Sequence, residues 1–164
     1  MTQALPDDYP FLAYAFIPSE EPIMVGDTID LDVIITNPYK DEEGNVKPVT
    51  IQKIDIIILT GGETTKYLSS AKTYTDIVYN DSTIRVTTNP QNGSDILVKP
   101  PTGSSSFTIS NHSITFSLNN ITVNKAMGTV EIGISQYTVL EGNKVVCNTN
   151  ADDQDNDAYK LVKL

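Results

Sequence analysis

Apolar and polar residues alternate strictly over several short segments of this chain. In residues 27–37, every second position holds a large aliphatic residue: Ile29, Leu31, Val33 and Ile35. The positions between them are mostly polar: Thr28, Asp30, Asp32 and Thr36. The alternation returns in residues 113–118, and residues 51–59 place Ile54, Ile56 and Ile58 on one face opposite a mixed face. A period of two with one apolar face is typical of half-buried strands in antiparallel sheets.

Further strands with weaker alternation are predicted along the rest of the chain: residues 11–17, 74–79, 83–87, 95–99, 106–109, 129–139, 144–148 and 159–164. Turn dipeptides such as Asn37-Pro38 and Gly61-Gly62 separate these segments at short spacing. Residues 139–145 predict a hairpin, and no segment carries a helical stripe. Nine to eleven short strands predict an all-β fold, a two-sheet antiparallel β-sandwich of jelly-roll or immunoglobulin-like type.

Composition agrees with this fold class. Isoleucine (18), valine (13) and threonine (19) make up 50 of the 164 residues, against 7 alanines. β-branched residues suit pleated strands, whereas alanine favours helices. The length suits one domain, which we divide into an N-terminal arm and apolar strand (residues 1–22) and a β-sandwich domain (residues 23–164).

The segment from Phe11 to Ile17 is apolar on both faces and is flanked by prolines at positions 6, 10, 18 and 22. One interpretation is a first strand that lies in its own sandwich. The other is a strand that completes a neighbour's sheet, with backbone hydrogen bonds for affinity and alternate side chains for register. In that case the subunit interface consists of Phe11, Leu12, Tyr14, Phe16 and Ile17.

The chain is strongly acidic, with 21 acidic and 11 basic residues and a net charge of −10. Arg85 is its one arginine. This balance argues against nucleic acid bound through a basic surface and against an anionic membrane surface. No run approaches the roughly 20 apolar residues of a membrane-spanning helix, so no membrane insertion is expected. Divalent cations are the more natural partners of such a chain.

The acidic run at residues 151–159 is the strongest candidate metal site. Asp153, Asp155 and Asp157 follow a D-x-D-x-D spacing, and Asp152 adds a fourth carboxylate. A curled loop brings alternate side chains inward, and Ca²⁺ prefers several oxygen ligands. The run lacks the glycine and glutamate that complete an EF-hand loop. It is predicted to be either a calcium loop or a solvated acidic loop.

Other acidic groups are weaker candidates for the same chemistry. Asp41 and Glu43 belong to a turn between two predicted strands, which either binds metal or faces water. Asp30 and Asp32 share the polar face of one strand. Asp7 and Asp8 precede the N-terminal strand, where a cation bridging two subunits would relieve carboxylate repulsion.

No catalytic residue is assigned, and the chain is predicted not to be an enzyme. It has one histidine, His112, and one cysteine, Cys147, and no protease signature surrounds either. We expect Cys147 to be a buried core thiol and His112 to lie at the surface. A glycosidase site built from two carboxylates remains an open alternative among 21 acids.

A binding module is the alternative to a structural role. Tyrosines such as Tyr67, Tyr74 and Tyr79 could line a site for glycans, although the chain has no tryptophan. Four N-glycosylation sequons fit a secreted chain: Asn80, Asn92, Asn111 and Asn120. The first residues lack the basic and apolar stretches of a signal peptide.

The layout of the chain resembles a known class of secreted protein. Residues 24–59 hold Val25-Gly26-Asp27-Thr28-Ile29, an alternating strand that ends at Ile35-Thr36-Asn37, a polar loop, and then Val49-Thr50-Ile51 before a hydrophobic strand. Together with the proline-flanked N-terminus and the acidic loops, this resembles the subunits of archaeal extracellular tubules called cannulae. More distantly it is similar to jelly-roll filament subunits of the TasA class.

The resemblance implies an extracellular, self-assembling homopolymer in which an N-terminal strand is donated between subunits and calcium drives assembly. By position, residues 11–17 would be the donated strand and Asp153, Asp155 and Asp157 would be calcium ligands. We therefore predict a non-enzymatic structural subunit of an extracellular filament or tubule. The alternative is a monomeric cell-surface or viral β-sandwich that binds carbohydrate or a receptor.

Overall fold

The computed structural model describes residues 11–89, 92–150 and 159–164, with the backbone alone at residues 92 and 93. Its first strands are β1 (Ala13–Pro18), β2 (Thr28–Thr36), β3 (Val49–Ile58), β4 (Ile77–Tyr79), β5 (Arg85–Asn89) and β6 (Asn92–Lys99). The chain continues with β7 (Phe107–Ile109), β8 (Ile114–Thr122), β9 (Gly128–Leu140), the 3-10 turn η1 (Glu141–Asn143), β10 (Lys144–Thr149) and β11 (Lys160–Lys163). Each of these strands overlaps a segment predicted from the sequence.

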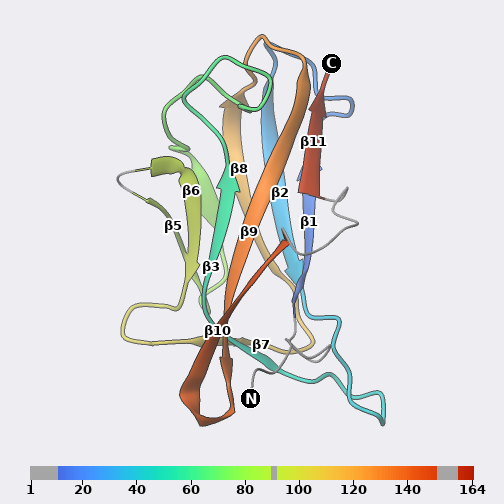
Figure 1. Ribbon diagram of the computed structural model, residues 1–164, viewed down its shortest axis with the longest axis vertical. Coiled ribbons are helices and arrows are strands. Elements are labelled where there is room, and N and C mark those ends of the chain that lie inside the picture. The colour runs from blue at the N-terminus through green and yellow to red at the C-terminus, as the bar shows by residue number, and fades with distance from the viewer. Residues whose placement is uncertain (1–10, 90–91, 151–158) are drawn as a thin grey trace, which may run out of the picture.

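The strands form two antiparallel sheets that pack face to face (Figure 1). The smaller sheet has the order β1-β2-β8-β4, and the larger sheet has the order β10-β9-β3-β6-β5. β11 also pairs with the first residues of β9, and β7 with the first residues of β3. The predicted two-sheet β-sandwich is confirmed. Among the described residues, no helix is long and apolar enough to cross a membrane.

The core lies between the sheets and consists largely of the aliphatic residues that alternate along each strand. Ile29, Leu31, Val33 and Ile35 of β2 are all buried, as the sequence pattern predicted. The opposite sheet contributes Ile54, Ile56 and Ile58 of β3 and Val130, Ile132 and Ile134 of β9. The smaller sheet adds Ile114, Phe116 and Leu118 of β8.

Two irregularities in pairing explain where strict alternation fails. The register between β3 and β9 shifts between Ile51 and Lys53, so Ile51 and Ile54 are both buried although they are three residues apart. The register between β2 and β8 also shifts, and Asn120 has a φ of 56°. An extra residue in one strand returns the following side chains to the core face. In this way Ile121 is buried as well as Leu118.

The predicted hairpin at residues 139–145 is present as β9, η1 and β10. The expected burial of Cys147 is wrong, because its thiol is exposed on β10. Cys147 pairs with Tyr137 of β9, whereas the next pair, Asn148 and Gln136, points inward. Because Val145, Val146 and Cys147 are all apolar, the sequence shows no alternation here that would predict which of them face the core. His112 is exposed, as expected.

Candidate functional site

The open edge of the sandwich formed by β1 and β11 holds the residues predicted to meet another subunit. β1 is the outermost strand of the smaller sheet and pairs with β2, from Ala13 opposite Thr36 to Pro18 opposite Leu31. β11 lies beside it at the edge of the larger sheet (Figure 1). An isolated parallel bridge between Ile23 and Lys163 ties the segment between β1 and β2 to β11, and the backbone N–H of Leu164 donates to the carbonyl of Ile23 at 2.8 Å.

The backbone of β1 faces outward at alternate residues. The amide of Ser19 donates to the carbonyl of Asp30 at 2.8 Å, and Pro18 has no N–H. Because hydrogen-bonded and non-hydrogen-bonded pairs alternate in an antiparallel ladder, Ala15 and Ile17 exchange bonds with β2. The N–H groups of Tyr14 and Phe16 therefore point to the outer edge. No described strand pairs with that edge.

A buried glutamine anchors the start of this segment. Gln136 of β9 is fully buried, and its Oε1 accepts hydrogen bonds from the backbone N–H of Leu12 and the hydroxyl of Tyr14, both at 2.9 Å. Its amide nitrogen donates to Thr138 Oγ1 at 2.8 Å. Burial, followed by the nearby Tyr159 and Tyr39, raises the pKa of Tyr14, which keeps this hydroxyl protonated. The segment is thus fixed to the opposite sheet by polar contacts as well as packing.

Aromatic rings close the gap between the two sheet edges. The ring of Tyr159 meets those of Tyr14 and Phe16 edge-on, with centroids 6.3 Å apart in each pair. Phe11 packs against Tyr14 at 5.4 Å. The hydroxyl of Tyr39 donates to the carbonyl of Phe11 at 2.7 Å. Edge-to-face pairs of this kind add to the burial energy.

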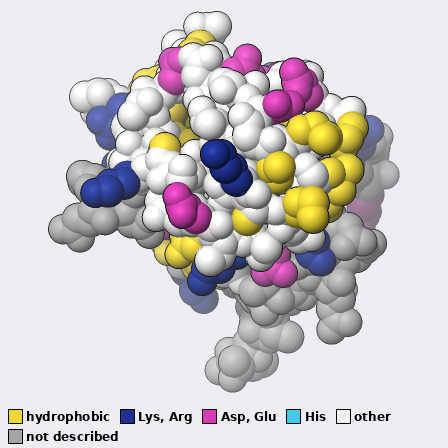
Figure 2. Space-filling model, turned by 90° about the horizontal axis from the view of Figure 1, so that it is seen from above, with side chains coloured by type: hydrophobic (Ala, Val, Ile, Leu, Met, Phe, Trp, Pro, Cys, Tyr) yellow, Lys and Arg dark blue, Asp and Glu magenta, His cyan; other side chains and the backbone are white. Residues whose placement is uncertain are grey.

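Four apolar side chains on β1, in the segment that follows it, and on or directly after β11 are each about half exposed: Ile17, Met24, Val162 and Leu164. Val162 and Leu164 line a shallow groove between β1 and β11, together with Phe16, Pro18 and Leu161 and the charged Glu21 and Lys160. Figure 2 looks down on the end of the molecule where the C-terminus lies and shows hydrophobic side chains gathered at one side.

The five residues predicted to form a subunit interface therefore differ in burial. Leu12 and Tyr14 are buried within their own chain, and Phe11 and Phe16 pack against the core and remain partly exposed. Ile17 is exposed on the outer face. In this structure the chain closes the sandwich with its own first strand.

The acidic run with Asp152, Asp153, Asp155 and Asp157 lies outside the described residues, as do Asp7 and Asp8. The second predicted group is described. Asp41 Oδ1 accepts the backbone N–H groups of Glu43 and Asn45, both at 2.9 Å. These bonds, that from Asn45 foremost, lower the pKa of Asp41. Among the described residues, no three His, Cys, Asp or Glu side chains gather as a metal site.

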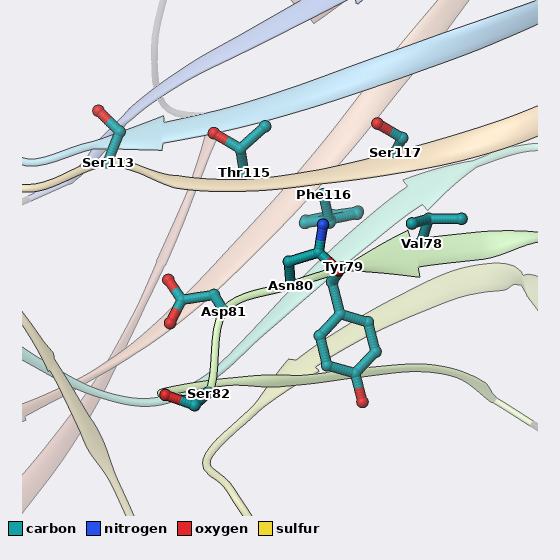
Figure 3. A pocket seen from close by; sticks show the side chains of 9 residues that line it. All are labelled: Val78, Tyr79, Asn80, Asp81, Ser82, Ser113, Thr115, Phe116 and Ser117. Carbon is teal, nitrogen blue, oxygen red and sulfur yellow. The ribbon is translucent and has the colours of Figure 1, made fainter.

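The outer face of the smaller sheet is rich in hydroxyl and carboxylate groups. Asp32 Oδ1 accepts from Ser117 at 2.5 Å, and Asp30 Oδ1 accepts from the backbone N–H of Asn120 at 2.9 Å. Beyond them, a pocket opens between β4 and β8 (Figure 3). Ser113, Thr115 and Ser117 project from one side of β8, and Tyr79 and Asp81 lie opposite.

The tyrosines suggested as a ligand platform do not form one. Tyr74 is buried, and its hydroxyl donates to the carbonyl of Ile58 at 2.9 Å. Tyr67 packs at another end of the molecule, beside Gly62. Tyr79 alone of the three lines the pocket of Figure 3.

A pair of carboxyl groups on the outer face of the larger sheet was missed by sequence reasoning. Asp55 of β3 and Asp95 of β6 are diagonal neighbours, because Asp55 pairs with Leu97 and Ile57 with Asp95. Burial, followed by the charge of Asp95, raises the pKa of Asp55, while Lys53 and Lys99 oppose the shift. One oxygen of each carboxyl is buried without a hydrogen-bond partner. Asp55 was assigned to this face from the sequence, but its pairing with Asp95 depends on strand order.

Comparison with known proteins gives distant similarity of fold. No protein-family model matches the chain, and no curated protein matches it in sequence. The crystal structure of BslA, described as a bacterial hydrophobin, is similar with a TM-score of 0.46 and 10% identity over 93% of this chain and 95% of that one.

Two other solved structures show the same level of similarity. An uncharacterized Nocardia farcinica protein with an immunoglobulin-like fold has a TM-score of 0.44 and 10% identity, over 92% of this chain and 96% of that one. The collagen-binding domain of a Staphylococcus aureus adhesin has a TM-score of 0.37 and 13% identity, over 83% and 95%.

Proposed function

We propose that this chain is a non-enzymatic, extracellular structural subunit that associates with further copies of itself through the edge formed by β1 and β11. The proposal rests on one observation: the outer edge of β1 is unpaired and uncharged in the described structure. β1 offers outward N–H groups at Tyr14 and Phe16, and it contains no charged residue. Monomeric β-proteins usually protect such edges with charges, bulges or covering segments.

The occupant that fits this edge best is a second copy of the same strand. Two β1 strands related by a two-fold axis pair antiparallel, and each supplies the donors that the other accepts. The groove beside β1, lined by the exposed Val162 and Leu164, then lies next to its own copy. Glu21 and Lys160 line the same groove, so charges of both signs lie beside a two-fold contact.

Edge pairing is favoured over donation of β1 to a neighbour. Leu12 and Tyr14 are buried and bonded to Gln136 of their own chain. Donation requires these contacts to break before they form again in another subunit, whereas edge pairing leaves them in place. Strand donation is therefore the second mechanism, and it uses the same residues.

The test is a charge placed on the edge. We expect Ile17→Lys to abolish concentration-dependent association, measured by light scattering after size-exclusion chromatography and by negative-stain electron microscopy. Val78→Lys is the matched control, because Val78 is similarly exposed but lies on β4 at the opposite edge of the same sheet. If both variants associate like the unmodified chain, or if the unmodified chain stays monomeric at every concentration, the proposal is wrong.

A disulfide across β1 and β2 separates the two mechanisms. Ala15 and Ile34 face each other in this pair, so Ala15→Cys with Ile34→Cys, in a Cys147→Ser background, holds β1 in its own sheet. Assembly that survives oxidation supports edge pairing. Assembly that appears only after reduction supports strand donation.

A glycan-binding module is the second candidate, favoured by the pocket of Figure 3. Thr115, Ser117 and Asp81 line it with hydroxyl and carboxylate groups, whereas the ring of Tyr79 points away from the hydroxyls of β8 and packs against the core. Such hydroxyl and carboxylate groups bond sugar hydroxyls. A glycan array with the unmodified chain and Thr115→Ala tests it, and loss of a signal in the variant supports this function.

A further inference from the structure

A lysine and an asparagine are buried against each other near the C-terminal end of the sandwich. Lys163 of β11 is 1% exposed, and Asn124, which follows β8, is 4% exposed. Lys163 Nζ lies 2.5 Å from Asn124 Oδ1 and 2.5 Å from the carbonyl oxygen of Tyr67. The two side chains come from segments 39 residues apart in the sequence.

Hydrogen bonds fix the orientation of the Asn124 amide. Its Oδ1 also accepts the backbone N–H of Ala126 at 3.1 Å. Its Nδ2 donates to three carbonyl oxygens: Tyr67 at 2.7 Å, Thr64 at 3.1 Å and Gly62 at 3.2 Å. A flipped amide would place its oxygen against these three acceptors, so the network determines which atom faces Lys163.

The amine of Lys163 is buried among neutral partners. Its hydrogen-bond partners in the described residues are the Tyr67 carbonyl and the Asn124 amide oxygen. Burial lowers the pKa of Lys163, because a charged ammonium loses hydration that these neutral groups replace only in part. The neutral amine, which is the nucleophilic form, is therefore more populated here than at the surface.

We propose that Lys163 and Asn124 react to form an amide cross-link within the chain. The Nζ lone pair of the neutral amine attacks Asn124 Cγ, and the carbonyl electron pair moves to Oδ1. A proton then passes from Nζ to Nδ2, the Cγ–Nδ2 bond breaks as the Oδ1 pair returns, and one ammonia leaves. Amine and carboxamide give a secondary amide and ammonia, so the step needs no oxidant, reductant or cofactor.

Neighbouring groups favour this reaction in three ways. The Ala126 N–H points at Oδ1, where negative charge develops during attack. The Tyr67 carbonyl accepts hydrogen bonds from both the attacking and the departing nitrogen, so it keeps the two nitrogens close to each other. Burial of both side chains keeps water from the amide and holds the reactants in contact.

The cross-link would join β11 to the segment that follows β8. It closes a loop of chain that contains β9 and β10, and it fixes β11 at the edge of the larger sheet. This inference is independent of self-association, because a monomer forms the bond as readily as an assembly.

Intact-mass spectrometry of the folded full chain tests the proposal directly. The expected mass is lower than the sequence mass by one ammonia, and a protease digest yields one branched peptide joining Lys163 to Asn124. Lys163→Arg keeps a buried cation but cannot form this bond, and Asn124→Ala removes the electrophile. Both variants are expected to show their full sequence mass.

Three results would overturn the cross-link: an unmodified chain with its full sequence mass, a loss of ammonia that persists in Lys163→Arg or Asn124→Ala, or a digest that places the loss elsewhere. The first result concerns the unmodified chain, so it stands even if a variant fails to fold. A cross-linked chain should also unfold at a higher temperature than folded Lys163→Arg, since the bond restricts the unfolded state.

Discussion

Asp55, which lies beside Asp95 on the outer face of the larger sheet, contributes to the pH dependence of stability. Burial and the neighbouring carboxyl raise the pKa of Asp55, so the folded chain holds a proton that the unfolded chain releases. The stabilisation is fully present below the unfolded pKa and is lost as the pH rises through the folded one. At neutral pH the charge on Asp55 therefore opposes folding.

We expect Asp55→Asn to raise the free energy of unfolding at pH 7, by less than about 1 kcal/mol because the pair is partly exposed to solvent. The gain should shrink as the pH falls toward the ordinary carboxyl range, where the unmodified chain is protonated too. Urea titrations between pH 3 and pH 8 measure both effects. A variant that is equally destabilised at every pH would contradict this assignment.

Asp41 should show the opposite dependence. Backbone N–H groups, that of Asn45 first, lower the pKa of its exposed carboxyl. Its stabilisation is present above the unfolded pKa and is lost as the pH falls through the folded pKa. We expect Asp41→Ala to be less stable than the unmodified chain at pH 7 and equal to it once both are acidified, in the same titrations. A difference that grows on acidification would contradict this.

The sequence pattern predicted the sheet face of Asp55 but not its neighbour across the strands. The alternation in residues 51–59 placed Asp55 on the face opposite Ile54, and the structure agrees. That Asp95 lies beside it depends on β3 pairing with β6, which joins residues about 40 positions apart. Local pattern carries no information on that pairing. For the same reason, nothing near Lys163 in the sequence points to Asn124.

At the scale of elements, Gln136 decides how the first strand is held. It accepts from both the Leu12 backbone and the Tyr14 hydroxyl in a fully buried position. Its own strand, β9, alternates as a core strand, so a leucine at this position would continue the pattern. The glutamine therefore buries less apolar surface than a leucine would, but its two hydrogen bonds fix the position of β1 against the opposite sheet.

We expect Gln136→Leu to lower the free energy of unfolding by about 1–3 kcal/mol, because the Leu12 N–H and the Tyr14 hydroxyl are left buried without a partner. The double variant Gln136→Leu, Tyr14→Phe should recover part of the lost stability, because Phe has no hydroxyl that would be left without an acceptor. Denaturant unfolding of the three variants measures this coupling. Strictly additive losses would show that Tyr14 and Gln136 do not act together.

The positions of the strands were largely predictable from the sequence, but the bulges within them were not. The apolar faces of β2 and β8 follow strict alternation, because each residue's face is set by its neighbours along the chain. In β3 the phase changes between Ile51 and Ile54, and the sequence alone showed only a mixed face. A bulge shows itself as an interrupted pattern, but locating it requires knowing the partner strand, here β9.

At the scale of the whole molecule, the open side of the sandwich is set by strand order. The alternation predicted two sheets, but no local signal places β1 and β11 at neighbouring edges. Their apposition arises because β1 pairs outside β2 and β11 outside β9. The groove lined by Phe16, Val162 and Leu164 thus joins residues from both ends of the chain, and that is why, of these three, only Phe16 was named from the sequence as an interface residue.

The net charge of −10 opposes any association of copies through this edge. Asp152, Asp153, Asp155 and Asp157 immediately precede β11 in the sequence, and Tyr159 packs on Phe16 of β1. Calcium bound by these carboxylates would reduce the net negative charge that opposes association. It would also stabilise the folded chain in proportion to its occupancy.

We expect calcium at about ten times its dissociation constant to stabilise the chain by about 1.4 kcal/mol. Since flexible extracellular sites bind at about 10⁻⁴–10⁻³ M, millimolar calcium should raise the melting temperature and promote association. The variant Asp153→Asn, Asp155→Asn, Asp157→Asn should lose both responses, whereas Asp41→Asn with Glu43→Gln should keep them. Sodium chloride at matched ionic strength separates binding from screening, because it screens the charges without occupying a calcium site. Equal responses to sodium and calcium would assign the effect to charge screening alone.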